Sequence, residues 1–87
     1  MARMYDLRQK EVINTSDGTR FGFVDDIELC IKTGKVIAII VPGPGRLLGM
    51  FGRDQEYRIG WEMIHKIGDD IILVDCFTSK VLIEHEV

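Results

Sequence analysis

Several residue types that carry chemistry are scarce in this 87-residue chain. It has two cysteines, Cys30 and Cys76, and two histidines, His65 and His85. Two cysteines are too few for a disulfide framework, and they lack the Cys-x-x-Cys spacing of a redox motif or a zinc site. Neither has an electropositive immediate neighbour that would lower the pKa of its thiol. We therefore expect reduced thiols, no bound metal and no cofactor.

Charge of one sign and long apolar runs are also missing. Fourteen acidic and eleven basic residues give a net charge of -3, and the basic residues are scattered along the chain. This balance offers no long-range positive field for phosphate backbones or anionic lipids. The longest apolar run, residues 36–42, is too short to cross a bilayer, and residues 1–6 lack the apolar region of a secretory signal. We expect a cytoplasmic protein without a membrane span.

The scarcity of histidine argues against nucleophilic catalysis. A catalytic Cys, Ser or Thr needs an oriented base within hydrogen-bond reach, and the sequence has only His65 and His85 for that role. Cys30 on a strand is more typical of a small buried apolar residue than of a nucleophile. The adjacent carboxylates at residues 25–26 and 69–70 point apart on strands or cap backbone groups in turns. The sequence therefore predicts no catalytic residues and a protein that is not an enzyme.

What the chain does have is the composition of one small globular domain. Hydrophobic residues make up 46% of it and charged residues 29%, which is far from the composition of disordered chains. A chain of this length can bury only one core. We predict a single domain over residues 1–87, with a core over about residues 7–75 and a C-terminal extension over residues 76–87. Because so small a domain is marginally stable, dimerisation would help it.

Hydrophobic alternation and turn residues predict strands over residues 11–15, 20–31, 36–41, 55–60 and 71–74. Asp17 and Gly18 predict a two-residue hairpin turn after the first strand, because glycine adopts a positive φ without steric cost. Alternation fails in the middle of the second strand, so we expect a β-bulge at residues 25–26. A sixth strand around residues 81–83 and a frayed C-terminal end fit the sequence equally well.

Two segments indicate what the strands must pack against. Residues 36–41 are apolar at every position, which requires the core on one face of the sheet and a helix, a loop or another subunit on the other. The single tryptophan, Trp61, lies in a short helical turn over residues 61–66. We expect Trp61 to be a buried anchor whose truncation costs about 3–5 kcal/mol. The other expected structural positions are Gly18, Gly22 and Gly68.

A glycine-rich loop over residues 43–52 carries the candidate interaction residues. It lacks the Gly-Lys-Ser/Thr ending of a phosphate-binding loop, and Pro44 removes an amide that such a loop would use. Bulky apolar side chains stand among its glycines, and ordering them is costly unless they are buried. Either they plug the end of the β-structure or they dock on a second subunit or a partner. The candidate interaction residues are Arg46, Leu47, Leu48, Met50, Phe51 and Arg53.

Nucleic-acid binding is the alternative function. It requires aromatic and basic side chains interleaved on one open face. Phe21 and Phe23 instead share the parity of the core, and Tyr57 and Trp61 stand beside glutamates. An RNA-associated module would use the basic side chains of Arg46, Arg53, Arg58 and Lys66.

Three segments, taken in their order and spacing, resemble the PRC-barrel domain family over about residues 7–75. They are the glycine turn with residues 20–26, the turn at residues 33–36 into an apolar strand, and the closing segment over residues 61–74. Residues 48–52, Leu-Gly-Met-Phe-Gly, resemble the short YlmC/YmxH-like members, which are described as sporulation-associated. Gly60 departs from the family, whose members often place proline before the tryptophan; this loosens entry to the turn without threatening the fold.

The resemblance implies both a fold and a class of function. The fold is all-β, a small PRC-type β-barrel of five to six mostly antiparallel strands with one short helical turn around Trp61. Similar barrels in a ribosome-maturation protein and in a photosynthetic reaction-centre subunit imply a docking scaffold without catalytic residues. We therefore expect a non-enzymatic protein-interaction module, homodimeric and with an unidentified protein partner. The resemblance leaves open whether it serves sporulation or RNA maturation.

Overall fold

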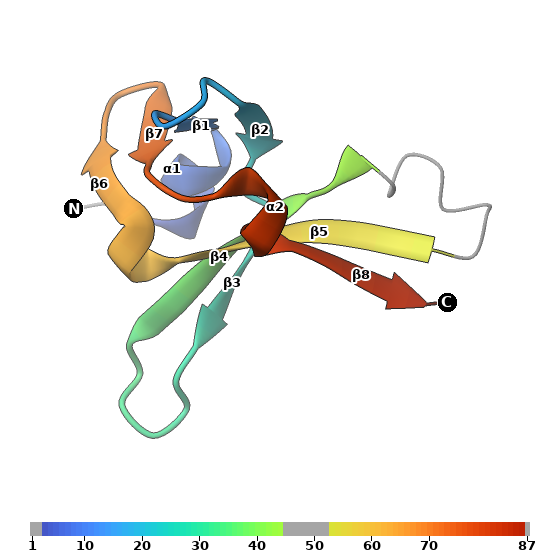
Figure 1. The fold of residues 1–87 in the computed structure, drawn as a ribbon. Helices are drawn as coiled ribbons and strands as arrows, with labels where there is room; N and C mark the ends of the chain where they lie inside the picture. Colours follow the sequence, from blue (N-terminus) through green and yellow to red (C-terminus); the bar gives the residue numbers. More distant parts are fainter. Residues whose placement is uncertain (1–2, 45–52, 87) are drawn as a thin grey trace.

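The computed structural model describes residues 3–44 and 53–86, which form two four-stranded sheets (Figure 1). The first sheet has the strand order β2-β1-β7-β6, with β2 at Arg20–Phe23, β1 at Glu11–Asn14, β7 at Ile71–Val74 and β6 at Ile64–Ile67. The second has the order β3-β4-β5-β8, with β3 at Asp26–Leu29, β4 at Val36–Pro42, β5 at Arg53–Gly60 and β8 at Leu82–Glu86. The short helices are α1 (Met4–Arg8), η2 (Trp61–Met63) and α2 (Thr78–Val81).

The fold is mostly β, as predicted, but five to six strands is too few. The described residues contain eight strands, and none of their ladders joins one sheet to the other. One pairing is parallel: β1 runs beside β7 with Val12 opposite Ile72. The remaining ladders are antiparallel. No helix in the described part of the chain is long and apolar enough to cross a membrane.

The predicted strand over residues 20–31 is wrong, because that segment forms two strands in different sheets. β2 ends at Phe23 and β3 begins at Asp26. Val24, between them, is buried in the core, and the Asp25 N–H donates to the Ile40 carbonyl at 2.8 Å. Alternation therefore fails at residues 24–25 because the chain crosses from one sheet to the other there, and no bulge of a continuous strand is involved.

The turn between β1 and β2 is longer than the expected two-residue hairpin. It spans residues 15–19, and the Gly18 N–H donates to the Asn14 carbonyl at 2.8 Å. Gly18 has φ +76° and Gly22 has φ +109°, so both positions favour glycine over residues with a Cβ. Gly68 has no positive φ, and its N–H donates to the Ile71 carbonyl at 2.8 Å.

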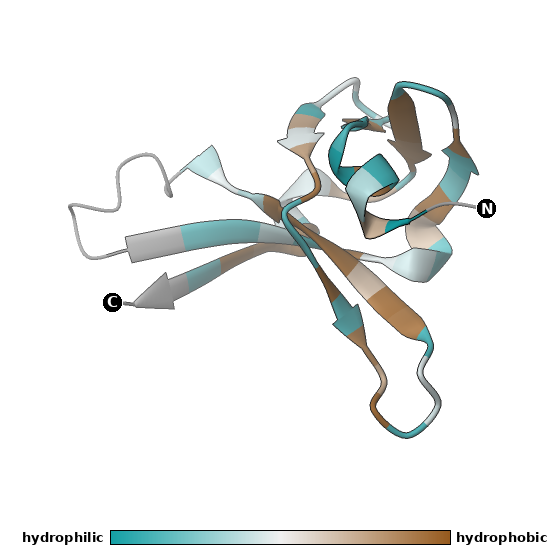
Figure 2. Cartoon of the chain, turned by 180° about the vertical axis from the view of Figure 1, so that it is seen from behind, coloured by the Kyte–Doolittle hydropathy of each residue, from teal (hydrophilic) through white to brown (hydrophobic). Residues whose placement is uncertain are grey.

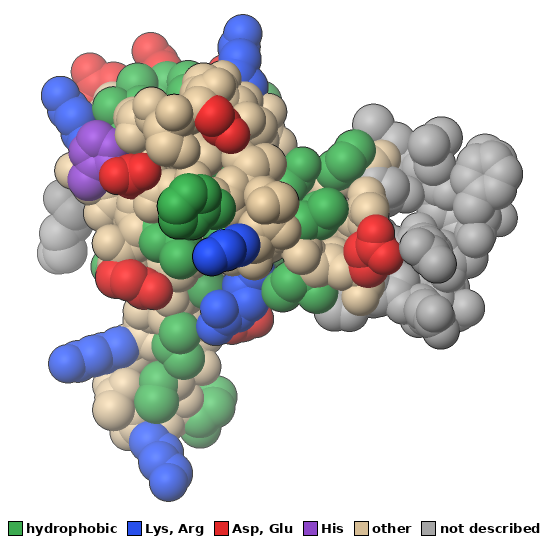
Figure 3. Space-filling view, in the orientation of Figure 1, with side chains coloured by type: hydrophobic (Ala, Val, Ile, Leu, Met, Phe, Trp, Pro, Cys, Tyr) green, Lys and Arg blue, Asp and Glu red, His purple; other side chains and the backbone are tan. Residues whose placement is uncertain are grey.

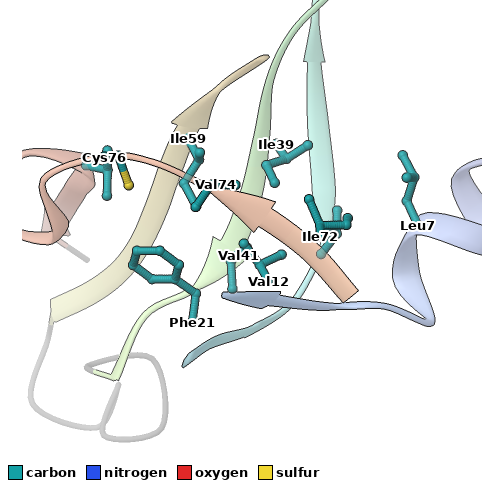
Figure 4. Packing of buried hydrophobic residues seen from close by; sticks show 11 residues of the cluster. Leu7, Val12, Phe21, Ile39, Val41, Ile59, Ile72, Val74 and Cys76 are labelled. Carbon is teal, nitrogen blue, oxygen red and sulfur yellow. The ribbon is translucent and has the colours of Figure 1, made fainter. Parts of the chain in front are cut away.

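The core lies between the two sheets (Figure 4). It forms because alternate side chains of each strand point to the same face. The fully buried members of this core cluster are Val12, Ile72 and Val74 from the first sheet and Ile39, Val41 and Ile59 from the second. The Phe21 and Tyr57 rings, 4.7 Å apart, add an aromatic contact between the sheets. The hydropathy colouring shows β4 as a nearly continuous apolar strand (Figure 2).

An ion pair crosses the outer face of β4. Ala38 and Ile40 are buried there, on the face opposite the core residues Ile39 and Val41. Ala38 lies opposite Glu28 on β3, and Ile40 lies opposite Arg58 on β5. Arg58 Nε donates to Glu28 Oε1 at 2.7 Å, so the pair spans the apolar strand from one neighbour to the other. The aliphatic stem of an arginine can cover apolar surface in this way.

The C-terminal segment contributes both a strand and core contacts. β8 pairs antiparallel with β5, from Arg53 opposite Glu86 to Tyr57 opposite Leu82. The predicted strand in this segment is therefore confirmed, and it extends to Glu86. Val81, at the end of α2, is 5% exposed and belongs to the core cluster.

The turn after β5 differs from the prediction, and so does the position of its tryptophan. The helical part covers only Trp61–Met63, because β6 begins at Ile64. Trp61 is 38% exposed, so the expectation that it is buried is wrong. Met63 and Ile64 pack against the core instead, since the turn passes directly into β6 and brings those two side chains inward.

Candidate interaction surface

A buried polar side chain at the end of β1 organises the candidate surface. Asn14 shares the core-facing parity of Val12 and is fully buried. Its Nδ2 donates to the Cys76 carbonyl at 2.8 Å and to Thr78 Oγ1 at 3.1 Å. Its Oδ1 accepts from the Cys76 N–H at 3.3 Å and from the Ser16 N–H and hydroxyl at 3.2 and 3.0 Å. These bonds hold residues 76–78 against β1.

A second set of bonds ties the same two segments together nearer the surface. The Thr78 hydroxyl donates to Asp17 Oδ2 at 2.8 Å, and the Ser16 hydroxyl donates to the Cys76 carbonyl at 2.9 Å. Hydrogen bonds from the Thr19 N–H and hydroxyl, and then from Thr78, lower the pKa of Asp17, so its carboxylate is charged at neutral pH. We call these five residues, Asn14, Ser16, Asp17, Cys76 and Thr78, the Asn14 network.

The Asn14 network presents Phe77 at the surface. Phe77 stands between Cys76 and Thr78, which the network holds on both sides, and it is 71% exposed. Lys80 Nζ lies 5.0 Å from the centroid of its ring, within cation–π distance. Single exposed apolar side chains are common on protein surfaces. Phe77 differs because its backbone is fixed from below by buried hydrogen bonds.

Two hollows flank Phe77, and together with it they form what we call the Phe77 cleft. One has a volume of about 500 Å³ and the other about 570 Å³, and both share Ser16, Cys76 and Phe77. Met63 and Val81 line the first hollow, whereas Tyr57 and Leu82 line the second. In the space-filling view, hydrophobic side chains gather over α2 and beyond it along the sheet that holds β8 (Figure 3). Volumes of this size are typical of ligand pockets.

The rim of the Phe77 cleft carries more negative than positive charge. Asp75 lines the first hollow and Asp17 the second, and Lys80 is the only basic side chain on either described lining. Burial raises the pKa of the Cys76 thiol, and the charges of Asp17 and Asp75 raise it further, which places both carboxylates within electrostatic reach of the shared floor. The cleft is therefore suited to apolar groups accompanied by positive charge.

Five of the six residues predicted for interaction fall in the part of the chain that the structure does not describe, so their role stays a prediction. Arg46, Leu47, Leu48, Met50 and Phe51 are outside the described residues. Arg53 begins β5, where its backbone pairs with Glu86. Of the other basic residues named for RNA contact, Arg58 is ion-paired with Glu28 and Lys66 is exposed on β6.

Sequence reasoning missed Asn14 and Phe77. A polar residue at the core parity of the first strand was the signal available for Asn14. The sequence held no comparable signal for Phe77, which was only an aromatic residue in the expected C-terminal extension. Its exposure depends on tertiary contacts, which the sequence does not show.

The candidate catalytic residues make structural contacts. His65 Nε2 lies 3.3 Å from Thr15 Oγ1, but the Thr15 hydroxyl donates to the Val74 carbonyl at 3.1 Å. The Asp26 carboxylate accepts from the Ile27 N–H at 2.8 Å, as capping carboxylates do. The described residues include no group of three or more His, Cys, Asp or Glu able to hold a metal ion.

The two thiols differ in reactivity. Hydrogen bonds from the Thr33 hydroxyl, and then from the Thr33 and Lys32 N–H groups, lower the pKa of Cys30, although no electropositive residue stands next to it in the sequence. Cys76 is buried with a raised pKa. At neutral pH we expect an alkylating reagent to modify Cys30 about tenfold or more faster than Cys76, because only the thiolate reacts. Mass spectrometry of timed, digested samples measures both rates; equal rates in the folded protein, rather than only in urea, would contradict the assignment.

Comparison with known proteins gives one consistent result. A family model described as the PRC-barrel domain matches residues 1–81. The probable sporulation protein YlmC of Bacillus subtilis is 43% identical over 74 residues, which cover 85% of this chain and 91% of that protein. An uncharacterized protein of Clostridium acetobutylicum is 38% identical over 69 residues, 79% of this chain and 78% of its own. The uncharacterized protein YmxH of Bacillus subtilis is 28% identical over 75 residues, covering 84% and 87% of the two chains.

Proposed function

Since this chain belongs to the PRC-barrel family, we propose that it is a protein-interaction module and not an enzyme. The observation that carries the proposal is the Phe77 cleft. A 71% exposed aromatic side chain stands between two hollows, on a backbone held by the fully buried Asn14. Aromatic side chains are enriched in interfaces, and fixing one in advance reduces the entropy lost on binding.

We also propose that the two sheets together form one barrel and that this barrel is a single domain. The chain crosses between the sheets at residues 24–25, again at η2 and a third time over residues 75–81, so the sheets alternate along the sequence. Their inner faces share one core cluster, which includes Val81 from the C-terminal segment. We infer a small PRC-type barrel formed as a single domain over residues 1–87.

A role in sporulation is also part of the proposal. It is supported by the identity to the relative named probable sporulation protein YlmC, which extends over most of both chains. A binding module suits such a role, because its contribution lies in the partner that it holds and requires no chemistry of its own.

Self-association through residues 43–52 is the form of interaction that we propose first. Leu47, Leu48, Met50 and Phe51 are four bulky apolar residues within this short segment. If all four side chains were exposed to solvent they would form an apolar patch prone to non-specific association, and an interface between two copies would bury them. A two-fold homodimer buries the same segment twice with one symmetric arrangement.

The test is the oligomeric state of a double variant. We expect wild-type protein to sediment as a dimer and the Leu48→Asp, Phe51→Asp variant to sediment at the 9.9 kDa of one chain. Two charges buried in an apolar interface would oppose association. The β-type circular dichroism should be unchanged, because the ladders of the described strands do not include these residues.

The matched control is Phe23→Asp, Ile31→Asp, which places the same charges at positions that are 53% and 91% exposed. It should remain dimeric. Loss of fold in the Leu48, Phe51 variant would mean that the loop plugs the barrel.

Retention of RNA by wild-type protein at physiological salt, abolished by Arg46→Glu with Arg53→Glu, would contradict the proposal and favour the RNA-associated alternative.

A further inference from the structure

We propose that the Phe77 cleft is the receptor for residues 46–53 of a second copy of this chain. The inference rests on the proposed self-association and names the surface on which the segment docks. It makes the dimer contact reciprocal: the segment of each copy occupies the cleft of the other, which is the isologous arrangement of a two-fold dimer.

The shape of the cleft suits this occupant. Two hollows separated by one aromatic ring present two apolar floors, lined by Met63 and Val81 on one side and by Tyr57 and Leu82 on the other. The segment carries two pairs of apolar side chains, Leu47-Leu48 and Met50-Phe51, separated by Gly49. One pair can therefore enter each hollow, with the glycine passing over Phe77, where the backbone must approach closely.

The charges are complementary as well. Asp17 stands on one hollow and Asp75 on the other, and Lys80 is already placed over the Phe77 ring. The segment begins with Arg46 and ends with Arg53, and no acidic residue stands between them. Arginine pairs well with carboxylates at interfaces because its planar guanidinium can donate two parallel hydrogen bonds.

The attachment of the segment favours docking between copies over docking within one. The Gly43 N–H donates to the Gln55 carbonyl at 2.9 Å, so the chain just after β4 lies beside the start of β5. The end of β4 and the start of β5 lie at the far end of the arm that these strands form with β8, away from α2 (Figure 1). Eight residues span at most about 29 Å when extended, and a segment pinned at both ends reaches about half of that. That reach is comparable to the roughly 13 Å between Arg53 and Tyr57 along β5, so one copy's own segment would meet only the nearer hollow, whereas a neighbour's segment can fill both.

The experiment pairs a receptor variant with a segment variant. Phe77→Asp should be monomeric, with the dissociation constant raised by about 30-fold for each of the two contacts, as at an interface hot spot. Because Phe77 is 71% exposed, the variant should fold like wild type, which circular dichroism checks; Phe77→Ser serves if it does not. Mixing the Phe77→Asp variant with the Leu48→Asp, Phe51→Asp variant should give a heterodimer. The native segment of the first variant can then dock in the native cleft of the second. Native mass spectrometry distinguishes the heterodimer from both parents by mass.

Each outcome decides the inference. A heterodimer about 30-fold tighter than either variant's own dimer supports it, provided that the control Phe23→Asp still forms wild-type dimers. If Phe77→Asp stays dimeric while the segment variant is monomeric, the cleft is not the receptor and the proposed self-association stands. If both variants are monomeric and their mixture is too, the two surfaces do not contact each other and the inference fails. A monomeric wild type would overturn the proposed dimer and this inference together.

Discussion

Replacing Asn14 by leucine should lower the free energy of unfolding by about 3 kcal/mol, because it removes every hydrogen bond of a fully buried amide. The Cys76 N–H loses the Asn14 Oδ1 acceptor in the core, and the Thr78 hydroxyl loses the Nδ2 donor. An unpartnered buried polar group costs about 1–3 kcal/mol. For a domain of this size the melting midpoint should fall by about 10–20 °C, measured by circular dichroism at a fixed protein concentration.

Two further variants separate the network from a general effect of leucine. Thr78→Val removes one partner of Asn14 and leaves the Cys76 bonds, so we expect a loss of about 1 kcal/mol. Gln9→Leu changes an exposed amide and should alter stability by less than about 0.5 kcal/mol. If Asn14→Leu melts at the wild-type midpoint, the buried network does not stabilise the fold.

Local patterns predicted the strands better than they predicted their partners. Alternation and turn residues place β4, β5 and β7 where the structure has them, because these signals lie within a few residues of each strand. The bonds of Asn14 reach Cys76, 62 residues away, and no pattern near Asn14 names that partner. The sequence therefore shows a polar residue at a core-facing position, but it does not show the distant hydrogen-bond partner that explains the residue.

The crossing between sheets shows the same limit. The failure of alternation near Asp25 was visible in the sequence, and a bulge was one physical reading of it. The other reading, a change of sheet, depends on whether residues 26–29 pair with β1 or with β4, and they pair with β4. Pairing is a contact across the chain, so one strand's sequence leaves both readings open.

The candidate interaction surface divides into a predicted half and an unpredicted half. The apolar segment around Leu48 and Phe51 was found from composition alone, and its role stays a prediction. The Phe77 cleft was not found, because its hollows are lined by residues of β5, η2, α2 and β8 together with the turn after β1. A site assembled from so many elements has no local sequence signature, whereas a single glycine-rich loop has one.

The second large effect should come from Ile59, and it replaces Trp61 as the anchor near the β5 end. Ile59 is 0% exposed and lies opposite Ile39 in the core, so Ile59→Ala should cost about 2–5 kcal/mol through lost burial and the cavity left behind. That is a large part of the stability of an 87-residue domain, for which about 4–13 kcal/mol is typical.

Trp61→Ala should cost less, about 1–2 kcal/mol, although it deletes the larger side chain, because Trp61 is 38% exposed and Met63 fills the inward position of the turn. Urea unfolding of both variants, followed by circular dichroism so that loss of the tryptophan does not affect the signal, gives the two free energies directly. Ile67→Ala, at a 41% exposed position on β6, is the matched control and should change stability by less than about 1 kcal/mol. If Trp61→Ala is the more destabilising of the two, the tryptophan anchors the turn despite its exposure, and the order of burial at this end of the fold does not set the order of stability.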